Sequence, residues 1–96
     1  MANLRMAPKA FDDLQNSVQW YEKRSSGAAE RFCRAIDDAL DDIVAKPRLF
    51  ARWDDRHRYF LLQRFPYYII YRLDGDIVTV AAIRHTSRDD LPLEDA

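Results

Sequence analysis

The sequence predicts an α+β domain with the element order β-α-α-β-β-β, in which a helical hairpin packs on one face of a small antiparallel sheet. Two segments of the first half carry apolar residues at helical spacing, with a short polar break between them. Three β-branched and aromatic runs follow, separated by Phe65-Pro66 and by Asp74-Gly75. A short stretch before the first helix, Asn3 to Met6, can form a further strand.

The first helix is predicted to begin near Pro8, because proline lacks the N–H that a first helical turn does not use. Its apolar face should hold Phe11, Leu14, Val18 and Tyr21, which recur at three- and four-residue spacing. The polar segment that follows interrupts this pattern and ends the helix.

The second helix should be capped by Ser26 or Gly27 and should end at Pro47. Because the turn between the two helices is short, they should be antiparallel neighbours. Aspartates occupy the side opposite the apolar stripe. The stripe consists of Ala29, Phe32, Cys33, Ile36, Leu40, Ile43 and Val44.

The last two strands, 67–71 and 77–83, are apolar on both faces, although a sheet with one wet face normally alternates. The helices can cover only one face, and no remaining segment is suited to cover the other. We therefore expect another polypeptide to cover it. A two- or four-residue loop at Asp74-Gly75 would place Arg72 and Arg84 on opposite faces, and a three-residue loop would place them on the same face.

Composition is consistent with one globular domain spanning residues 1–96, of which 89–96 form an acidic tail. The lone Cys33 excludes an internal disulfide and fits a reducing cytosol, and its helical phase favours a small core residue over a reactive thiol. The N-terminus has no secretion signal, and the longest apolar run, 65–71, is too short to span a bilayer. We expect a cytoplasmic protein without a membrane partner.

Charge is unevenly distributed, although the net charge of −1 argues against a dedicated nucleic-acid binder. The helical region, 9–44, has five basic and eight acidic residues, whereas the sheet region, 46–88, has nine basic and four acidic ones. The tail adds four acidic residues. This asymmetry can direct the basic sheet toward a negatively charged partner.

Arginines on or beside the predicted strands are the main candidates for a site. Guanidinium groups bind phosphate and carboxylate bidentately, but solvated arginines that pair with nearby aspartates are the simpler explanation. For Arg72, beside the turn, we favour an ordinary ion pair; for Arg64 and Arg84, at strand ends, we favour function. The full set is Arg58, Arg64, Arg72, Arg84 and Arg88.

His85 can act as a general acid or can donate a hydrogen bond at a strand end, and His57 is better explained as structural. The histidines and Cys33 lack metal-ligand spacing, and the chain has no glycine-rich phosphate loop, so we expect neither a metal nor a cofactor. Tyrosines of the sheet could stack on bases, although core packing or contact with a partner explains them equally well. These are Tyr59, Tyr67, Tyr68 and Tyr71.

The chain resembles the toxins of bacterial type II toxin–antitoxin systems, the RelE/ParE superfamily. The resemblance covers most of the chain and rests on the order and spacing of several motifs. In the helices these are Ala10, Asp13-Leu14, Trp20-Tyr21-Glu22, Phe32, Ile36, Leu40, Ile43 and Pro47. In the sheet they are Arg64-Phe65-Pro66-Tyr67, Ile69-Ile70-Tyr71, Asp74-Gly75-Asp76 and the closing Ile83-Arg84-His85-Thr86-Ser87-Arg88.

The resemblance implies this superfamily's β-α-α-β-β-β fold and a cognate antitoxin that wraps the toxin. The sheet has no lysine, no glutamate and no tyrosine after His85, so the chain looks more like the ParE branch, which blocks DNA gyrase, than like ribosome-dependent nucleases. We expect a growth-arresting, plasmid-stabilising toxin that acts by binding. The predicted target- or antitoxin-contacting residues are Arg58, Arg64, Tyr67, Arg84, His85 and Arg88.

Two alternatives remain open from the sequence. The first is a RelE-like, metal-independent endoribonuclease acting on messenger RNA at the ribosome. In it, Arg64 and Arg84 would stabilise the strained phosphate and His85 would protonate the leaving oxygen. The second is a degenerate toxin fold kept only as an interaction module.

Overall fold

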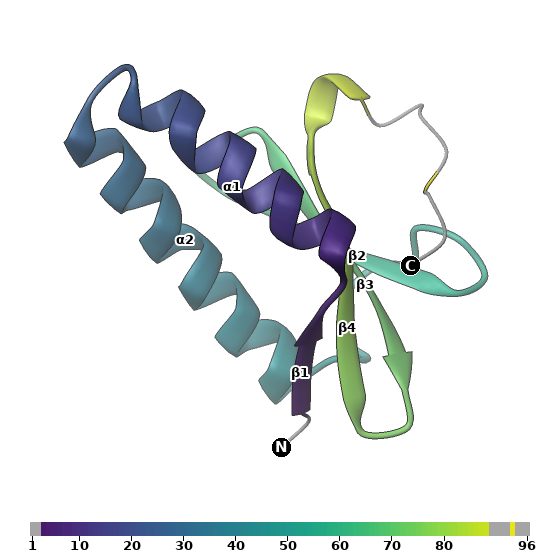
Figure 1. Cartoon of the computed structure of the whole chain (residues 1–96). Helices are drawn as coiled ribbons and strands as arrows, with labels where there is room; N and C mark the ends of the chain where they lie inside the picture. Colours follow the sequence, from purple (N-terminus) through teal and green to yellow (C-terminus); the bar gives the residue numbers. More distant parts are fainter. Residues whose placement is uncertain (1–2, 89–92, 94–96) are drawn as a thin grey trace.

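A helical hairpin lies against one face of a four-stranded sheet (Figure 1). The computed structural model describes residues 3–88 and Leu93, so the predicted acidic tail lies almost entirely outside the described residues. The element order matches the prediction. The elements are β1 (Asn3–Met6), α1 (Pro8–Glu22), α2 (Ser26–Ala45), β2 (His57–Leu61), β3 (Tyr67–Asp74), β4 (Ile77–His85) and the 3₁₀ turn η1 (Thr86–Arg88).

The sheet is mixed, with the strand order β1-β4-β3-β2. β2, β3 and β4 form the predicted antiparallel meander, but β1 pairs in parallel with β4, from Asn3 opposite Ile77 to Met6 opposite Val80. A parallel pair needs a long crossover connection, and here the helical hairpin and two strands supply it. The first and last strands therefore lie side by side.

The β3–β4 turn leaves two loop residues, Gly75 and Asp76, between the paired Asp74 and Ile77. Gly75 has φ +61°, and a positive φ at the first loop position is typical of the type II′ turns that fit twisted hairpins. The sequence anticipated a turn at this point, and glycine meets its backbone requirement without steric cost.

A β-bulge interrupts the β3–β4 ladder, because Ile70 pairs with Ala82 whereas Tyr71 pairs with Val80. The extra residue, Ala81, changes which side chains share a face. A regular two-residue hairpin would place Arg72 and Arg84 on opposite faces, but the bulge places them on the same one.

α1 begins at Pro8 and buries Ala10 and Ser17. The predicted apolar face is correct at Leu14, Val18 and Tyr21, which pack against the core. It is wrong at Phe11, whose side chain is 50 % exposed. The helix is rotated so that Ala10, with a smaller side chain, takes the position closest to the sheet.

α2 is capped by Ser25, one residue before the predicted candidates. The Ser25 hydroxyl accepts a hydrogen bond from the N–H of Ala28 at 2.9 Å, which satisfies one of the helix's unpaired donors. The buried side of α2 confirms the predicted stripe except at Cys33, Leu40 and Val44, which are half-buried, and it adds Ala39. Its buried residues are Ala29, Phe32, Ile36, Ala39 and Ile43.

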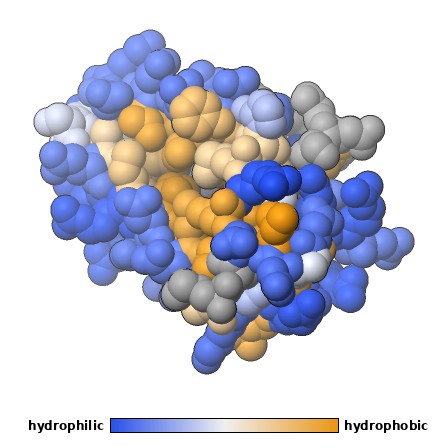
Figure 2. Space-filling view, turned by 60° about the horizontal axis from the view of Figure 1, so that its bottom comes forward, coloured by the Kyte–Doolittle hydropathy of each residue, from blue (hydrophilic) through white to orange (hydrophobic). Residues whose placement is uncertain are grey.

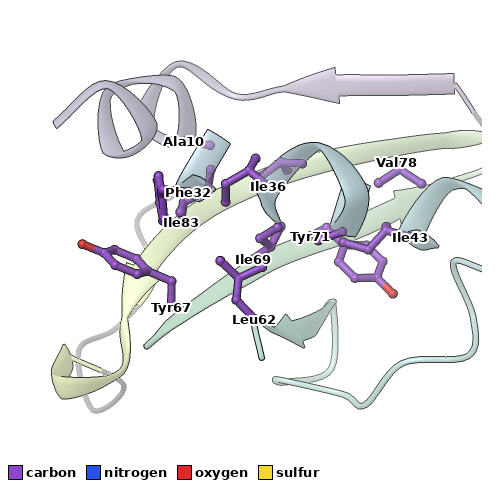
Figure 3. Close-up of a cluster of buried hydrophobic side chains, with 12 residues drawn as sticks. Ala10, Phe32, Ile36, Ile43, Leu62, Tyr67, Ile69, Tyr71, Val78 and Ile83 are labelled. Atoms are coloured by element: carbon purple, nitrogen blue, oxygen red, sulfur yellow. The ribbon is translucent and has the colours of Figure 1, made fainter. Parts of the chain in front are cut away.

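The main core lies between the hairpin and the sheet (Figure 3). Alternate residues of β3 point into it, including Ile69 and the fully buried Tyr71. The Tyr71 hydroxyl donates a hydrogen bond to the Pro47 carbonyl at 2.7 Å. Burial raises the pKa of Tyr71, an effect that nearby Arg58 partly offsets.

The other face of the sheet does not present the open apolar surface that the sequence predicted. Ile70 and Ala82 lie on this face and are almost completely buried. Trp53, from the α2–β2 connector, packs edge-on against Tyr59 and Tyr68 at ring-centroid distances of 5.6 Å and 5.3 Å. The prediction overlooked that this irregular connector could return an aromatic ring to the sheet.

The connector is held in place by its own hydrogen bonds. The Asp54 carboxylate accepts the backbone N–H groups of Arg56 and His57 and also contacts the His57 ring. Desolvation alone would raise the pKa of Asp54, but these hydrogen bonds give a net lowering. His57 is therefore structural, as its position suggested.

Candidate binding surface

The structure divides the predicted arginines into separate environments. Arg58 donates to the Phe50 carbonyl at 2.8 Å and so anchors the connector, a structural role that was not anticipated. Arg72 forms an ion pair with Asp74 at 3.0 Å, as favoured from the sequence. Arg64 is exposed and has no hydrogen bond or ion pair with any residue that the structure describes.

Arg64 lies in the β2–β3 turn, and backbone hydrogen bonds fix this turn. The N–H of Leu62 donates to the Tyr67 carbonyl at 3.0 Å and closes the turn. The N–H of Thr86 donates to the Pro66 carbonyl at 2.8 Å and joins it to the end of β4. The structure therefore places Arg64 at the same end of the sheet as His85.

His85 and Tyr67 are paired across β3 and β4, and their rings meet edge-on at 5.2 Å. The backbone N–H of Ser87 donates to His85 Nδ1 at 3.1 Å, and the Ser87 hydroxyl lies 2.8 Å from the same nitrogen. Because a backbone N–H can only donate, Nδ1 is the acceptor and the neutral ring carries its proton on Nε2.

Arg84 and His85 lie on opposite faces of the sheet. Arg84 is paired with Tyr68, on the face that carries Trp53, whereas His85 is paired with Tyr67, on the helix side. The candidates thus form two groups. Tyr67 and His85 share one end of the helix side, with Arg64 in the turn at that end, while Arg84 lies with Arg72 on the other face. Arg88 ends η1.

Four aromatic rings fill the core at the end of the molecule that holds Arg64 and His85. Tyr21 stacks on Phe32 at 4.9 Å, and both rings contact Phe65 at 5.3 Å. Tyr67 joins them through Phe32, at 5.1 Å. Burial, and then the nearby Tyr67, raise the pKa of Tyr21, while Arg24 lowers it. This end of the molecule is a tightly packed base from which exposed side chains extend.

Apolar side chains also reach the surface, and Figure 2 shows them gathered in the middle of one face and framed by hydrophilic residues. Leu4 of β1 and Phe11 of α1 are 45 % and 50 % exposed. Both belong to the helix side, because Leu4 is paired with the core residue Val78 and α1 packs on this side. Leu4 and Phe11 are candidates for contact with a protein partner.

Within residues 3–88 and Leu93, no group of three or more histidine, cysteine or acidic side chains is arranged to hold a metal ion. In the same ranges, no helix is long and apolar enough to cross a membrane.

Comparison with known proteins identifies the family. A family model described as "ParE toxin of type II toxin-antitoxin system, parDE" matches residues 4–90, which is nearly the whole chain. The chain belongs to the ParE toxin family. It is thus a toxin of the type II toxin–antitoxin class, as the resemblance implied.

Toxin ParE2 from two strains of Mycobacterium tuberculosis is 26 % identical over 83 residues, covering 85 % of this chain and 79 % of the relative. A solved structure titled "Chromosomal ParDE TA system from P. aeruginosa" matches with a TM-score of 0.66 and 20 % identity. The match covers 88 % of this chain and 96 % of the other. At this identity the structural match establishes a shared fold.

Two features of this ParE-family surface were missed from the sequence. The Arg24 guanidinium lies 3.9 Å from the centre of the Trp20 ring, and Trp20 is 47 % exposed. Trp20 lies in the last turn of α1 and Arg24 in the turn that follows, so their separation by four residues was the available signal. The second feature is the Trp53–Tyr59–Tyr68 cluster. It has no comparable local signal in the sequence, because Trp53 lies outside any regular element.

Proposed function

We propose that this ParE-family toxin arrests bacterial growth in the cytoplasm by binding DNA gyrase, and that a cognate antitoxin neutralises it. The family match over residues 4–90 carries the proposal. The structural match to a protein titled as part of a ParDE toxin–antitoxin system supports an antitoxin partner. We assign target contact to Arg64 and Arg84, and antitoxin contact to the exposed apolar side chains of Leu4 and Phe11.

Binding is favoured over RNA cleavage by the placement of the candidate catalytic residues. A nuclease needs its arginines and its general acid to converge on one phosphate. Arg84 and His85 lie on opposite faces of the sheet, and His85 Nδ1 is already occupied by Ser87. With these two residues on opposite faces, the toxin can contact a protein partner through both faces of the sheet, but it cannot bring both residues to one phosphate.

The first test is induction of the chain alone in bacteria, while labelled precursors report DNA and protein synthesis over the first minutes. Gyrase inhibition predicts that DNA synthesis falls first, because replication needs continuous removal of supercoils. An earlier fall in protein synthesis would favour the ribonuclease alternative. No effect on either would favour the degenerate module.

Purified gyrase provides the matching biochemical test. The toxin should inhibit supercoiling of relaxed plasmid, and an antitoxin that rescues growth on co-expression should restore it. Arg84→Ala should weaken inhibition more than His85→Ala, since a contacting charge matters more than an imidazole without a chemical role. Arg34→Ala, an exposed arginine of α2, is the control for loss of one positive charge. Supercoiling that continues at full rate with excess folded toxin would contradict the proposal.

A further inference from the structure

Trp20 is unusual among the exposed residues of the helical hairpin. It lies in the last turn of α1 with 47 % of its surface exposed, although tryptophan is usually well buried. Its ring packs edge-on against the ring of Tyr21, with the two centroids 4.9 Å apart. Tyr21 is in turn fixed by Phe32. Trp20 is therefore a rigid side chain that needs little further ordering when it binds.

Arg24 places a positive charge directly beside this ring, where a negatively charged partner can bind. The central carbon of its guanidinium lies over the Trp20 ring, 3.9 Å from the ring centre. The N–H donors lie in the plane of the guanidinium and remain directed sideways, where a carboxylate can accept two of them. Arg24 is exposed and forms no ion pair with any carboxylate in the described part of the chain.

Arg64 lies in the β2–β3 turn, at the end of the molecule that holds Trp20. Its neighbour Phe65 packs edge-on against Tyr21 at 5.3 Å, and Tyr21 is the residue after Trp20. The surface thus combines one exposed tryptophan and two arginines on a packed aromatic base. Tryptophan and arginine are the residues most enriched among those that dominate the energy of protein interfaces.

We propose that Trp20, Arg24 and Arg64 form a contact of the toxin with its target, and that this contact accepts an acidic segment of the target protein. The inference rests on the proposed function and names the chemistry of the partner. A polynucleotide fits less well, because duplex DNA requires cations repeated along an extended path, and this patch is compact.

The test measures binding of the folded toxin to purified gyrase A and B subunits without DNA. Trp20→Ala, Arg24→Ala and Arg64→Ala should each weaken binding at least about tenfold. Arg24→Glu should weaken binding more than Arg24→Ala, because the new carboxylate would face the acidic segment of the target. Arg24→Lys should restore only part of the affinity, because lysine lacks the planar fork.

Two variants are controls for surface changes elsewhere. Leu49→Ala removes an apolar side chain that is 67 % exposed on the connector, and Arg34→Ala removes an exposed charge on α2. Both should keep the wild-type affinity within about twofold. Circular dichroism and a cooperative urea transition confirm that every variant is folded, independently of antitoxin binding.

Three outcomes would overturn the inference while leaving the gyrase proposal intact. Trp20→Ala and Arg24→Ala could bind gyrase like the wild type. The same variants could lose the antitoxin instead, which would assign the patch to the antitoxin. The wild type could bind a duplex oligonucleotide through these residues, which would assign the patch to nucleic acid.

Failure of the proposed function has a different signature, because the wild type itself would then neither bind gyrase nor inhibit supercoiling. Growth arrest after induction would in that case test the patch directly. Trp20→Ala and Arg24→Ala must still relieve the arrest while folded and able to bind the antitoxin. Arrest of wild-type strength by these variants would refute the contact.

Discussion

Tyr71 shows how one residue can link the core to the connector. Its ring is fully buried between sheet and helices, and its hydroxyl reaches the carbonyl of Pro47 across 24 positions of the sequence. From the sequence, three roles were open for Tyr71: stacking on nucleic-acid bases, packing in the core, or contact with a partner. The structure resolves these options for Tyr71, because a fully buried ring cannot stack on a nucleic acid.

We expect Tyr71→Phe to lower the free energy of unfolding by about 1–2 kcal/mol, because the Pro47 carbonyl loses its partner. The raised pKa of Tyr71 adds a dependence on pH. Above the ordinary tyrosine pKa of 10.0 the unfolded chain loses this proton first, so the stability of the wild type falls as pH rises.

Urea unfolding at about pH 8 and about pH 11 measures both effects of this substitution. Tyr71→Phe should be the less stable protein at the lower pH and should lose less stability between the two. An equal alkaline loss in both proteins would mean that Tyr71 does not control this dependence.

Cys33 should react slowly with alkylating reagents. Burial raises the pKa of its thiol, and the nearby Asp37 and Glu22 carboxylates raise it further. The thiolate is the nucleophile, so near neutral pH the folded protein should react with iodoacetamide more slowly than the same chain in denaturant. The structure corrects the predicted core role, because Cys33 is only half-buried. Faster reaction of the folded protein would contradict the raised pKa.

At the scale of elements, α1 protects the edge of β4 beyond the short strand β1. The pairing of β1 ends at Val80, after which β4 has no further strand beside it on that side among the described residues. The Asp13 carboxylate accepts the Ile83 N–H at 3.1 Å and is also paired with Lys9. A carboxylate on a helix thus replaces the missing strand.

Replacement of Asp13 by alanine should lower the free energy of unfolding by about 1–3 kcal/mol, because the part-buried Ile83 N–H loses its acceptor. Asp12→Ala removes the same charge from an exposed neighbour and should change stability by no more than about 0.5 kcal/mol. Denaturant titration of the two variants gives the comparison. Equal losses would show that charge, and not the hydrogen bond, explains the effect.

Element types and order were predictable because each depends on a local pattern, whereas the details that place the site depend on tertiary contacts. The helical spacing of α2 and the Asp-Gly turn are visible in the sequence. The bulge at Ala81 cannot be recognised in the sequence, because either Ala81 or Ala82 could pair with Ile70. Without the bulge, the face that carries Arg84 cannot be determined.

At the scale of the whole molecule, the sequence identified the family but not the grouping of its candidate residues. Arg64, Tyr67 and His85 were named together with Arg84, yet the β-strand alternation places Arg84 on the opposite face from His85. Trp20 was part of a motif that carried the resemblance and Arg24 follows that motif, but neither was selected as a contact residue. The alternation of side chains along a strand shows which residues share a face only when the register of that strand is known. Contacts near the end of a helix likewise require the rotation of the helix to be known.

The parallel pairing of β1 with β4 has a consequence for how the toxin is made. β4 is the last strand to be synthesised, and it is the only described strand that pairs with both β1 and β3. A nascent chain that stops before Ile77 lacks the central partner of its own first strand. It also lacks the Ile83 N–H that Asp13 binds 70 residues earlier in the chain. β4 must therefore be translated before the fold can form, and chains that terminate before it should be harmless to the cell that makes them.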